Sequence, residues 1–102
     1  MTIAILQPTA RDQALARRLL AALEGEAESV EGPLARELPA LFQQGRPIVA
    51  IAAVGILVRI LAPLIKDKHL EPPVLAVAPD GSCVIPVLGG HRGANRLAQR
   101  IA

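Results

Sequence analysis

Apolar and polar residues alternate in blocks along the chain, and these blocks predict strands and helices in turn. Residues 2–6 form a short apolar run that is typical of a buried strand. Residues 47–54 form a longer run rich in Val, Ile and Ala, as expected for a strand buried on both faces of a parallel sheet. Gly55 follows this run, where we expect the turn from strand to helix.

The first predicted helix begins near Thr9 and ends at Gly25. Thr9 can cap it, with Asp12 three residues later in an arrangement that resembles a capping box. Its apolar stripe follows helical spacing and consists of Leu15, Leu19, Leu20 and Leu23. Further helices are predicted at residues 34–44, interrupted or bent at Pro39, and at residues 56–65 and 95–102.

The second half of the chain also predicts a β-hairpin. Asp80-Gly81 lies between apolar runs at residues 74–78 and 83–88, which is a strong hairpin signal. Pro86 cannot donate a ladder hydrogen bond, so we expect the second strand at a sheet edge. With a short strand at residues 28–30, the pattern predicts a three-layer α/β sandwich with a mostly parallel sheet and a C-terminal β-hairpin edge.

Length and composition narrow the possible functions. A chain of 102 residues fits one domain, and its only aromatic residue is Phe42, which disfavours binding of single-stranded nucleic acid by base stacking. Residues 1–45 hold four basic and six acidic side chains, whereas residues 46–102 hold seven basic and three acidic ones. This asymmetry indicates either scattered solvated charge or a second half that faces an anionic small molecule. We expect no nucleic-acid partner.

Targeting and redox signals favour a reducing, cytoplasmic setting. Cys83 is the only cysteine, so an intrachain disulfide is impossible, and we expect its side chain to be small, apolar and buried. The N-terminus lacks a signal-peptide pattern. Residues 48–65 are long enough to be considered as a membrane span, but Arg59 would lie deep in the bilayer, and Gly55 and Pro63 interrupt the helix. We therefore expect no membrane partner.

Two glycine turns are the candidate site. Gly55 should lie at the carboxyl end of a central strand, where ligands bind in open α/β sheets, and Arg59 follows one helical turn later. The second turn, with its three glycines, comprises Gly89, Gly90, His91, Arg92, Gly93 and Asn95. His91 can titrate near neutral pH, and Asn95 can cap a helix or donate to a ligand. Taken alone, Gly55 and Arg59 are better explained as a plain tight turn and a surface cation.

Other classes of site have little support in the sequence. The two histidines are 22 residues apart and the carboxylates of the second half are isolated, so we expect no metal site. Neither a dinucleotide fingerprint nor a P-loop is present. Lys66, Lys68 and His69 are explained by a solvated helix end as well as by a ligand.

The second half of the chain, from about residue 46, resembles the N-terminal domain of the CbiG family of cobalamin biosynthesis, the cobalt-precorrin-5A hydrolases. The matching residues form one ordered set: Gly55, Val58, Arg59, Ala62, Pro63, Leu64, Ile65, Lys68, Pro73, Val74, Gly81, Val84, Ile85, Gly90, His91, Gly93, Ala94 and Asn95. Gly89 departs from the usual Ser, and the last loop is one glycine shorter. The sequence GGHRGAN looks more like the version fused to precorrin-3B C(17)-methyltransferases.

The resemblance implies a ligand, a set of binding residues and a catalytic candidate. Precorrins carry several carboxylate arms, which suit the cations Arg59, Lys68 and Arg92 and the backbone of the glycine turns. In the hydrolase, the family reaction opens the ring-A lactone and releases acetaldehyde, and His91 would be the general base. In the fusion, a separate domain would use S-adenosylmethionine, and this domain would need no cofactor of its own.

The end of the chain bears on its partners. Nothing terminates the helix predicted at residues 95–102, so we expect residues 1–102 to be one domain cut from a longer enzyme and contacting a neighbouring domain of the same polypeptide. We expect this fragment to be inactive alone. The favoured function is the methyltransferase fusion, with the hydrolase or a non-catalytic assembly module as alternatives.

Overall fold

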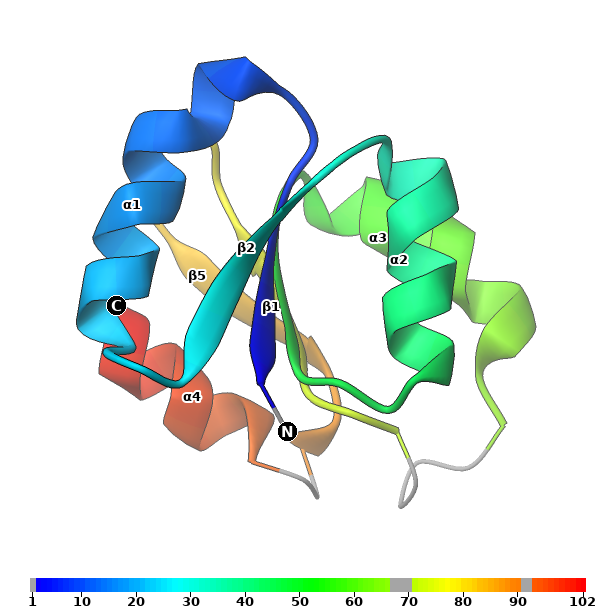
Figure 1. Cartoon of the computed structure of the whole chain (residues 1–102). Helices are drawn as coiled ribbons and strands as arrows, with labels where there is room; N and C mark the ends of the chain where they lie inside the picture. The colour runs from blue at the N-terminus through cyan, green and yellow to red at the C-terminus, as the bar shows by residue number, and fades with distance from the viewer. Residues whose placement is uncertain (1, 67–70, 91–92) are drawn as a thin grey trace.

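A five-stranded sheet forms the middle of three layers, with helices on both faces (Figure 1). The computed structural model describes residues 2–66, 71–90 and 93–102. The strand order is β2-β1-β3-β4-β5, with β1 paired in parallel to β2 and β3, β3 parallel to β4, and β4 antiparallel to β5. The predicted mostly parallel sheet with a C-terminal hairpin edge is confirmed.

The three inner strands consist mostly of apolar residues and are buried along their whole length. These are β1 (Ile3–Gln7), β3 (Ile48–Ile51) and β4 (Val74–Val77), and every residue in them is buried. Strands covered by helices on both faces require such continuous apolar runs. The edge strands, β2 (Ala27–Glu31) and β5 (Val84–Leu88), contain exposed residues.

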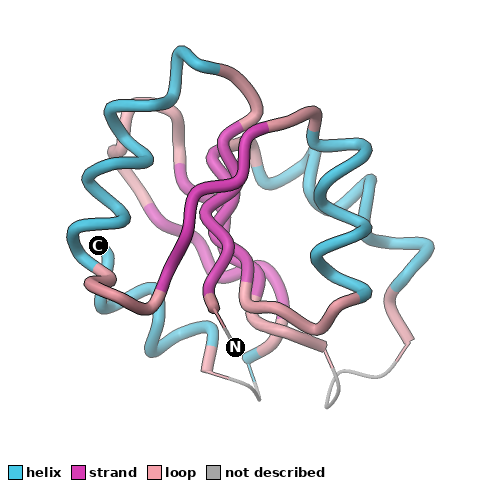
Figure 2. Tube along the Cα trace, in the orientation of Figure 1, coloured by secondary structure: helices cyan, strands magenta, loops and turns pink. Residues whose placement is uncertain are grey.

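The helices divide into two pairs, and each pair covers one face of the sheet (Figure 2). On one face lie α1 (Gln13–Ala22), preceded by the 3₁₀ turn η1 (Ala10–Asp12), and α4 (Ala94–Ile101). On the other lie α2 (Leu34–Gln43) and α3 (Val54–Leu61), the latter followed by the 3₁₀ turn η2 (Ala62–Leu64). The alternating inward side chains of the strands supply both cores.

Several predicted boundaries were wrong by a few residues, for local reasons. The strand predicted at residues 47–54 ends at Ile51, and α3 already begins at Val54, so Gly55 lies within the first helical turn. The helix predicted at residues 56–65 changes to 3₁₀ geometry at Ala62, because Pro63 has no N–H to continue the α-helical ladder. Thr9 makes no capping bond to the backbone; its hydroxyl donates to the Asp12 carboxylate at 3.3 Å.

The predicted burial of Cys83 was also wrong. Cys83 precedes β5 at the sheet edge and is exposed. The hairpin itself is as predicted: the Ser82 N–H donates to the Asp80 carboxylate at 2.9 Å, and Gly81 has a φ of 76°. The Ser82 hydroxyl and, to a lesser extent, that backbone bond lower the pKa of Asp80.

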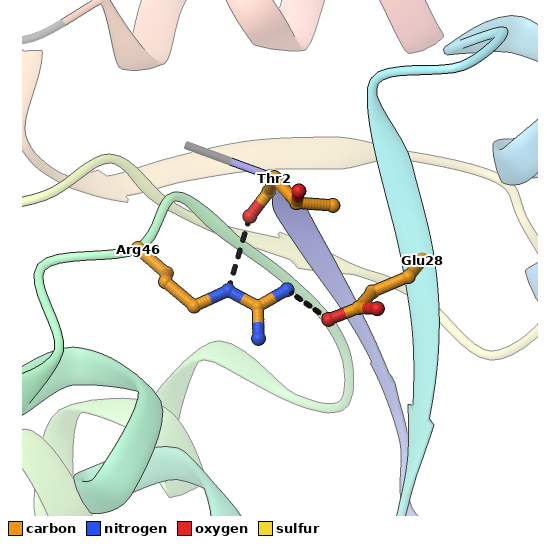
Figure 3. A network of polar contacts seen from close by, with 3 residues as sticks. All are labelled: Thr2, Glu28 and Arg46. Carbon is orange, nitrogen blue, oxygen red and sulfur yellow. Dashed lines mark hydrogen bonds and ion pairs between the residues drawn. The ribbon is translucent and has the colours of Figure 1, made fainter.

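Arg46 ties three strands together where their amino ends meet (Figure 3). Its Nε donates to the Thr2 carbonyl at 3.0 Å, and its Nη2 lies 2.6 Å from Oε1 of Glu28 in β2. Arg46 precedes β3 and Thr2 precedes β1, so one guanidinium connects β2, β1 and β3. Within the described residues, no helix is long and apolar enough to cross a membrane.

Candidate ligand-binding site

The two glycine turns lie at opposite ends of the parallel strands. Gly55 follows the carboxyl end of β3, whose last residue Ile51 pairs with the last residue of β4. Gly89 follows Leu88, which pairs with Val74 at the start of β4. Because β5 runs antiparallel to the other strands, its carboxyl end lies beside their amino ends. The expectation that both turns contribute to one site therefore does not fit the topology.

One cavity lined by described residues lies at the amino-terminal end of the parallel strands. Its volume is about 510 Å³, within the range of about 300–1,000 Å³ that is usual for small-molecule sites. The ends of α2 and η2 and the segment before β4 form its walls. The lining residues are Phe42, Gln43, Gly45, Pro63, Leu64, Lys66, Glu71 and Pro72.

A second cavity of about 260 Å³ adjoins the first across Glu71, which lines both. The end of β5 and the start of α4 form its remaining walls. The lining residues are Glu71, Pro86, Val87, Leu88, Gly89, Gly90 and Asn95. The second predicted glycine turn is thus part of a hollowed surface.

The glycines of this turn differ in what the fold demands of them. Gly89 has a φ of 78°, and a Cβ there would lie 2.6 Å from the Pro73 Cα, so only glycine fits. Gly93 precedes α4 with a φ of 98° and is required by its backbone conformation. A Cβ on Gly90 would meet nothing within 4 Å. The fold therefore does not require glycine at position 90, and the lack of a side chain there leaves the smaller cavity open.

Among the other predicted site residues that the structure describes, only Asn95 lines one of these two cavities. Its side chain is exposed at the first turn of α4. Arg59 is exposed on α3 and lines neither cavity. Lys68, His91 and Arg92 lie outside the described residues, so their predicted roles stay predictions.

The cavity walls combine donors with one buried acceptor. Lys66 brings a cation, and α4 presents the positive end of its dipole beside Asn95. Glu71 is only 8% exposed and lines both cavities. Such walls suit a ligand that carries both carboxylates and N–H groups. Among the described residues, no cluster of three His, Cys, Asp or Glu side chains could hold a metal ion.

Most residues of the larger cavity could not be predicted from the sequence. Phe42, Gln43 and Gly45 precede β3, and no chemical motif distinguishes them. Glu71 carried no usable signal either, because an acidic residue in a Pro-rich connection is ordinarily exposed to solvent. Only the fold brings this residue next to the glycine turn that follows β5.

Residues 36–102 match the family described as Cobalamin synthesis G N-terminal, CbiG_N. The chain belongs to this family. The matched range contains every residue that lines either cavity. The CbiG N-terminal resemblance that the sequence indicated is confirmed, whereas the fusion to a methyltransferase stays a prediction.

Two curated relatives of this CbiG N-terminal domain carry the same name, cobalt-precorrin-5A hydrolase. The protein from Priestia megaterium is 36% identical over 80 residues, which cover 78% of this chain. The protein from Salmonella typhimurium strain LT2 is 38% identical over 73 residues, which cover 71% of this chain. In each case the match spans 21% of the relative's length.

A solved structure agrees with the fold of the domain. It is a cobalamin biosynthesis protein G homologue from Sulfolobus solfataricus, which matches with a TM-score of 0.78 and 24% sequence identity. The match covers 98% of this chain and 33% of the homologue. The three-layer α/β architecture is therefore that of a known cobalamin biosynthesis protein G fold.

Proposed function

We propose that this CbiG N-terminal domain binds a carboxylated precorrin intermediate at the amino-terminal edge of its sheet, as part of a cobalt-precorrin-5A hydrolase. This proposal rests on the two adjoining cavities, which share Glu71 and include the Gly89–Gly90 turn. The names of the two curated relatives support the hydrolase assignment.

The chemistry of the walls agrees with such a ligand. A macrocycle with several carboxylate arms needs cations and N–H donors at its rim. Lys66 and the first turn of α4 supply these donors from two sides. Pro63 and Leu64 supply apolar surface for the ring, and Glu71 can accept a hydrogen bond from a ring N–H.

Catalysis is assigned to a larger assembly than this chain. His91 remains the proposed general base for lactone opening, on the strength of its motif. Because the chain spans 21% of each hydrolase relative, we expect the isolated chain to bind the intermediate without releasing acetaldehyde.

The test uses a chimera in which this chain replaces the matched segment of the Salmonella typhimurium hydrolase. Its cooperative unfolding is verified first. With cobalt-precorrin-5A, the chimera should release acetaldehyde, and both Lys66→Ala and His91→Ala should slow that release. A matched control is Arg36→Ala, an exposed cation on α2. Equal rates for Lys66→Ala and Arg36→Ala would contradict the cavity assignment.

The methyltransferase fusion is a second candidate, and it rests on the sequence GGHRGAN at residues 89–95. In that case the domain would present precorrin-3B to a separate S-adenosylmethionine-dependent domain. The two candidates differ in the ligand that they prefer. Titration of the chain with precorrin-3B and with cobalt-precorrin-5A separates them, because tighter binding of precorrin-3B favours the fusion.

A further inference from the structure

Helix α3 is apolar on its outer side as well as on its buried side. Leu57 and Leu61 pack into the core. Gly55 and Val58 on α3 and Ala62, the first residue of η2, are spaced three and four residues apart, which places them together on another face, and all three are exposed. Val58 is 45% exposed. A helix that is apolar on most sides is normally covered on most sides.

Edge strand β5 continues this apolar surface. Ile85 is 41% exposed and pairs with Ala76, whose side chain lies in the core beneath α2 and α3. Ile85 is therefore on the same face of the sheet as α3. Among the described residues, all exposed large apolar side chains lie on α3, at the end of η2 or on β5: Ile56, Val58, Ile65 and Ile85.

Strand addition does not explain this surface. The Ala78 N–H donates to the Cys83 carbonyl at 3.1 Å, and the alternation of an antiparallel ladder then directs the polar backbone groups of Ile85 toward β4. Those of Pro86 face outward, where proline has no N–H to offer. A partner therefore contacts the side chains of α3 and Ile85 rather than the backbone of the edge.

A second copy of the chain fits poorly. A two-fold pairing of α3 with α3 brings the two Arg59 side chains together, and among the described residues no carboxylate pairs with Arg59 to neutralise its charge. A different apolar helix that carries a carboxylate opposite Arg59 fits the stripe and its charge. The small residues Gly55 and Ala62 permit its close approach.

We propose that the outer face of α3, with Ile85, docks an apolar, carboxylate-bearing helix from the remainder of a hydrolase polypeptide. The curated relatives are about five times as long as the segment that the chain matches, so they contain ample further structure to supply this helix. The inference rests on family membership and on the hydrolase assignment, but not on the ligand in the cavities. A partner docked there lies next to both cavities, because Pro63 and Leu64 at the end of η2 and Val87 on β5 line them.

The test compares Val58→Glu with the matched control Ala40→Glu, which adds the same carboxylate to an exposed position on α2. Both variants of the isolated chain should unfold at the wild-type temperature, since both sites face solvent there. In the Salmonella chimera, Val58→Glu should separate one unfolding transition into two and raise the rate of limited proteolysis about tenfold. Ala40→Glu should do neither, and Arg59→Glu should behave as Val58→Glu does.

Three results would overturn the proposal. The first is a chimera in which Val58→Glu and Ala40→Glu unfold alike. The second is an isolated wild-type chain that sediments as a dimer and becomes a monomer on Val58→Glu, which identifies a second copy as the occupant. The third is an Arg59→Glu variant that docks as the wild type does, because this result contradicts a partner carboxylate opposite Arg59. Calorimetry and proteolysis require no ligand, so failure here is distinguishable from failure of precorrin binding.

Discussion

Gly89 lies against the backbone of Pro72, and this contact holds the end of β5 to the segment that enters β4. A Cβ on Gly89 would come closer to the Pro72 carbonyl oxygen than non-bonded atoms can, and would lie 2.6 Å from the Pro73 Cα. Both partners are backbone, so neither can turn away. The contact fixes one wall of the smaller cavity.

We predict that alanine destabilises the fold at Gly89 but not at the adjacent Gly90. Gly89→Ala should lower the free energy of unfolding by more than about 2 kcal/mol, because the left-handed φ and the backbone clash both oppose a side chain. Gly90→Ala should leave it within about 0.5 kcal/mol of wild type, since open space surrounds that position. Urea denaturation measures both. Equal destabilisation would contradict the described path of this turn.

Gly55→Ala should stabilise the isolated chain by about 0.5 kcal/mol. Gly55 has helical geometry and no atom within 4 Å of a built Cβ, so alanine brings better helix propensity without strain. Thermal unfolding of wild type and variant measures the change. A lower melting temperature would show that the fold itself needs glycine there, which the structure gives no reason to expect.

Arg46→Ala should cost about 1–2 kcal/mol of unfolding free energy. The change removes the bonds to the Thr2 carbonyl and to Glu28 from a side chain that is only 16% exposed. Arg36→Ala is the control, because Arg36 pairs with Glu37 while 69% exposed, and such surface pairs contribute about 0–1 kcal/mol. If urea midpoints fall equally for both variants, Arg46 does not connect the three strands.

The ion pair between Glu26 and Arg100 should make stability depend on acid pH. Hydrogen bonding and attraction from Arg100 lower the pKa of Glu26 below its ordinary value of 4.5. A carboxyl with a lowered folded pKa stabilises above its unfolded pKa, and this contribution disappears as the pH falls through the folded pKa. The melting-temperature difference between wild type and Arg100→Ala should therefore be larger at pH 7 than below the lowered pKa.

Arg96→Ala serves as the control for this pH dependence. Arg96 is exposed on the same helix, and the described residues give it no ion pair. Its melting-temperature difference from wild type should stay constant between neutral and acid pH. A difference for Arg100→Ala that is equally constant would contradict the lowered pKa of Glu26.

The fold was largely predictable because its signals are local. Continuous apolar runs marked the inner strands, the Asp80-Gly81 pair marked the hairpin, and Pro86 marked the edge. The end of β3 at Ile51 was missed because Ala52 and Ala53 are apolar and continue the sequence pattern of a buried strand. Hydrophobicity does not distinguish the last residue of a buried strand from the first turn of an equally apolar helix.

The candidate site was predictable only in part. The rule that ligands bind at the carboxyl ends of parallel strands directed attention to Gly55, whereas both cavities lie at the opposite edge. Gly89 and Gly90 lie there because β5 runs antiparallel to β4. Strand direction depends on the topology of the whole sheet and not on a local sequence pattern. Glu71 joins that turn across the sheet edge from a distant part of the sequence, which no local pattern could indicate.

The most direct measurement is calorimetric titration of the chain with cobyrinic acid, a corrinoid that carries free carboxylate arms. Gly90→Val fills the open side of the smaller cavity, and Gly55→Ala modifies the opposite edge of the sheet. We predict that Gly90→Val weakens binding about tenfold or more, and that Gly55→Ala binds as wild type does. Undiminished binding by Gly90→Val, with loss of binding in Gly55→Ala, would place the ligand at the carboxyl-terminal edge and contradict the account.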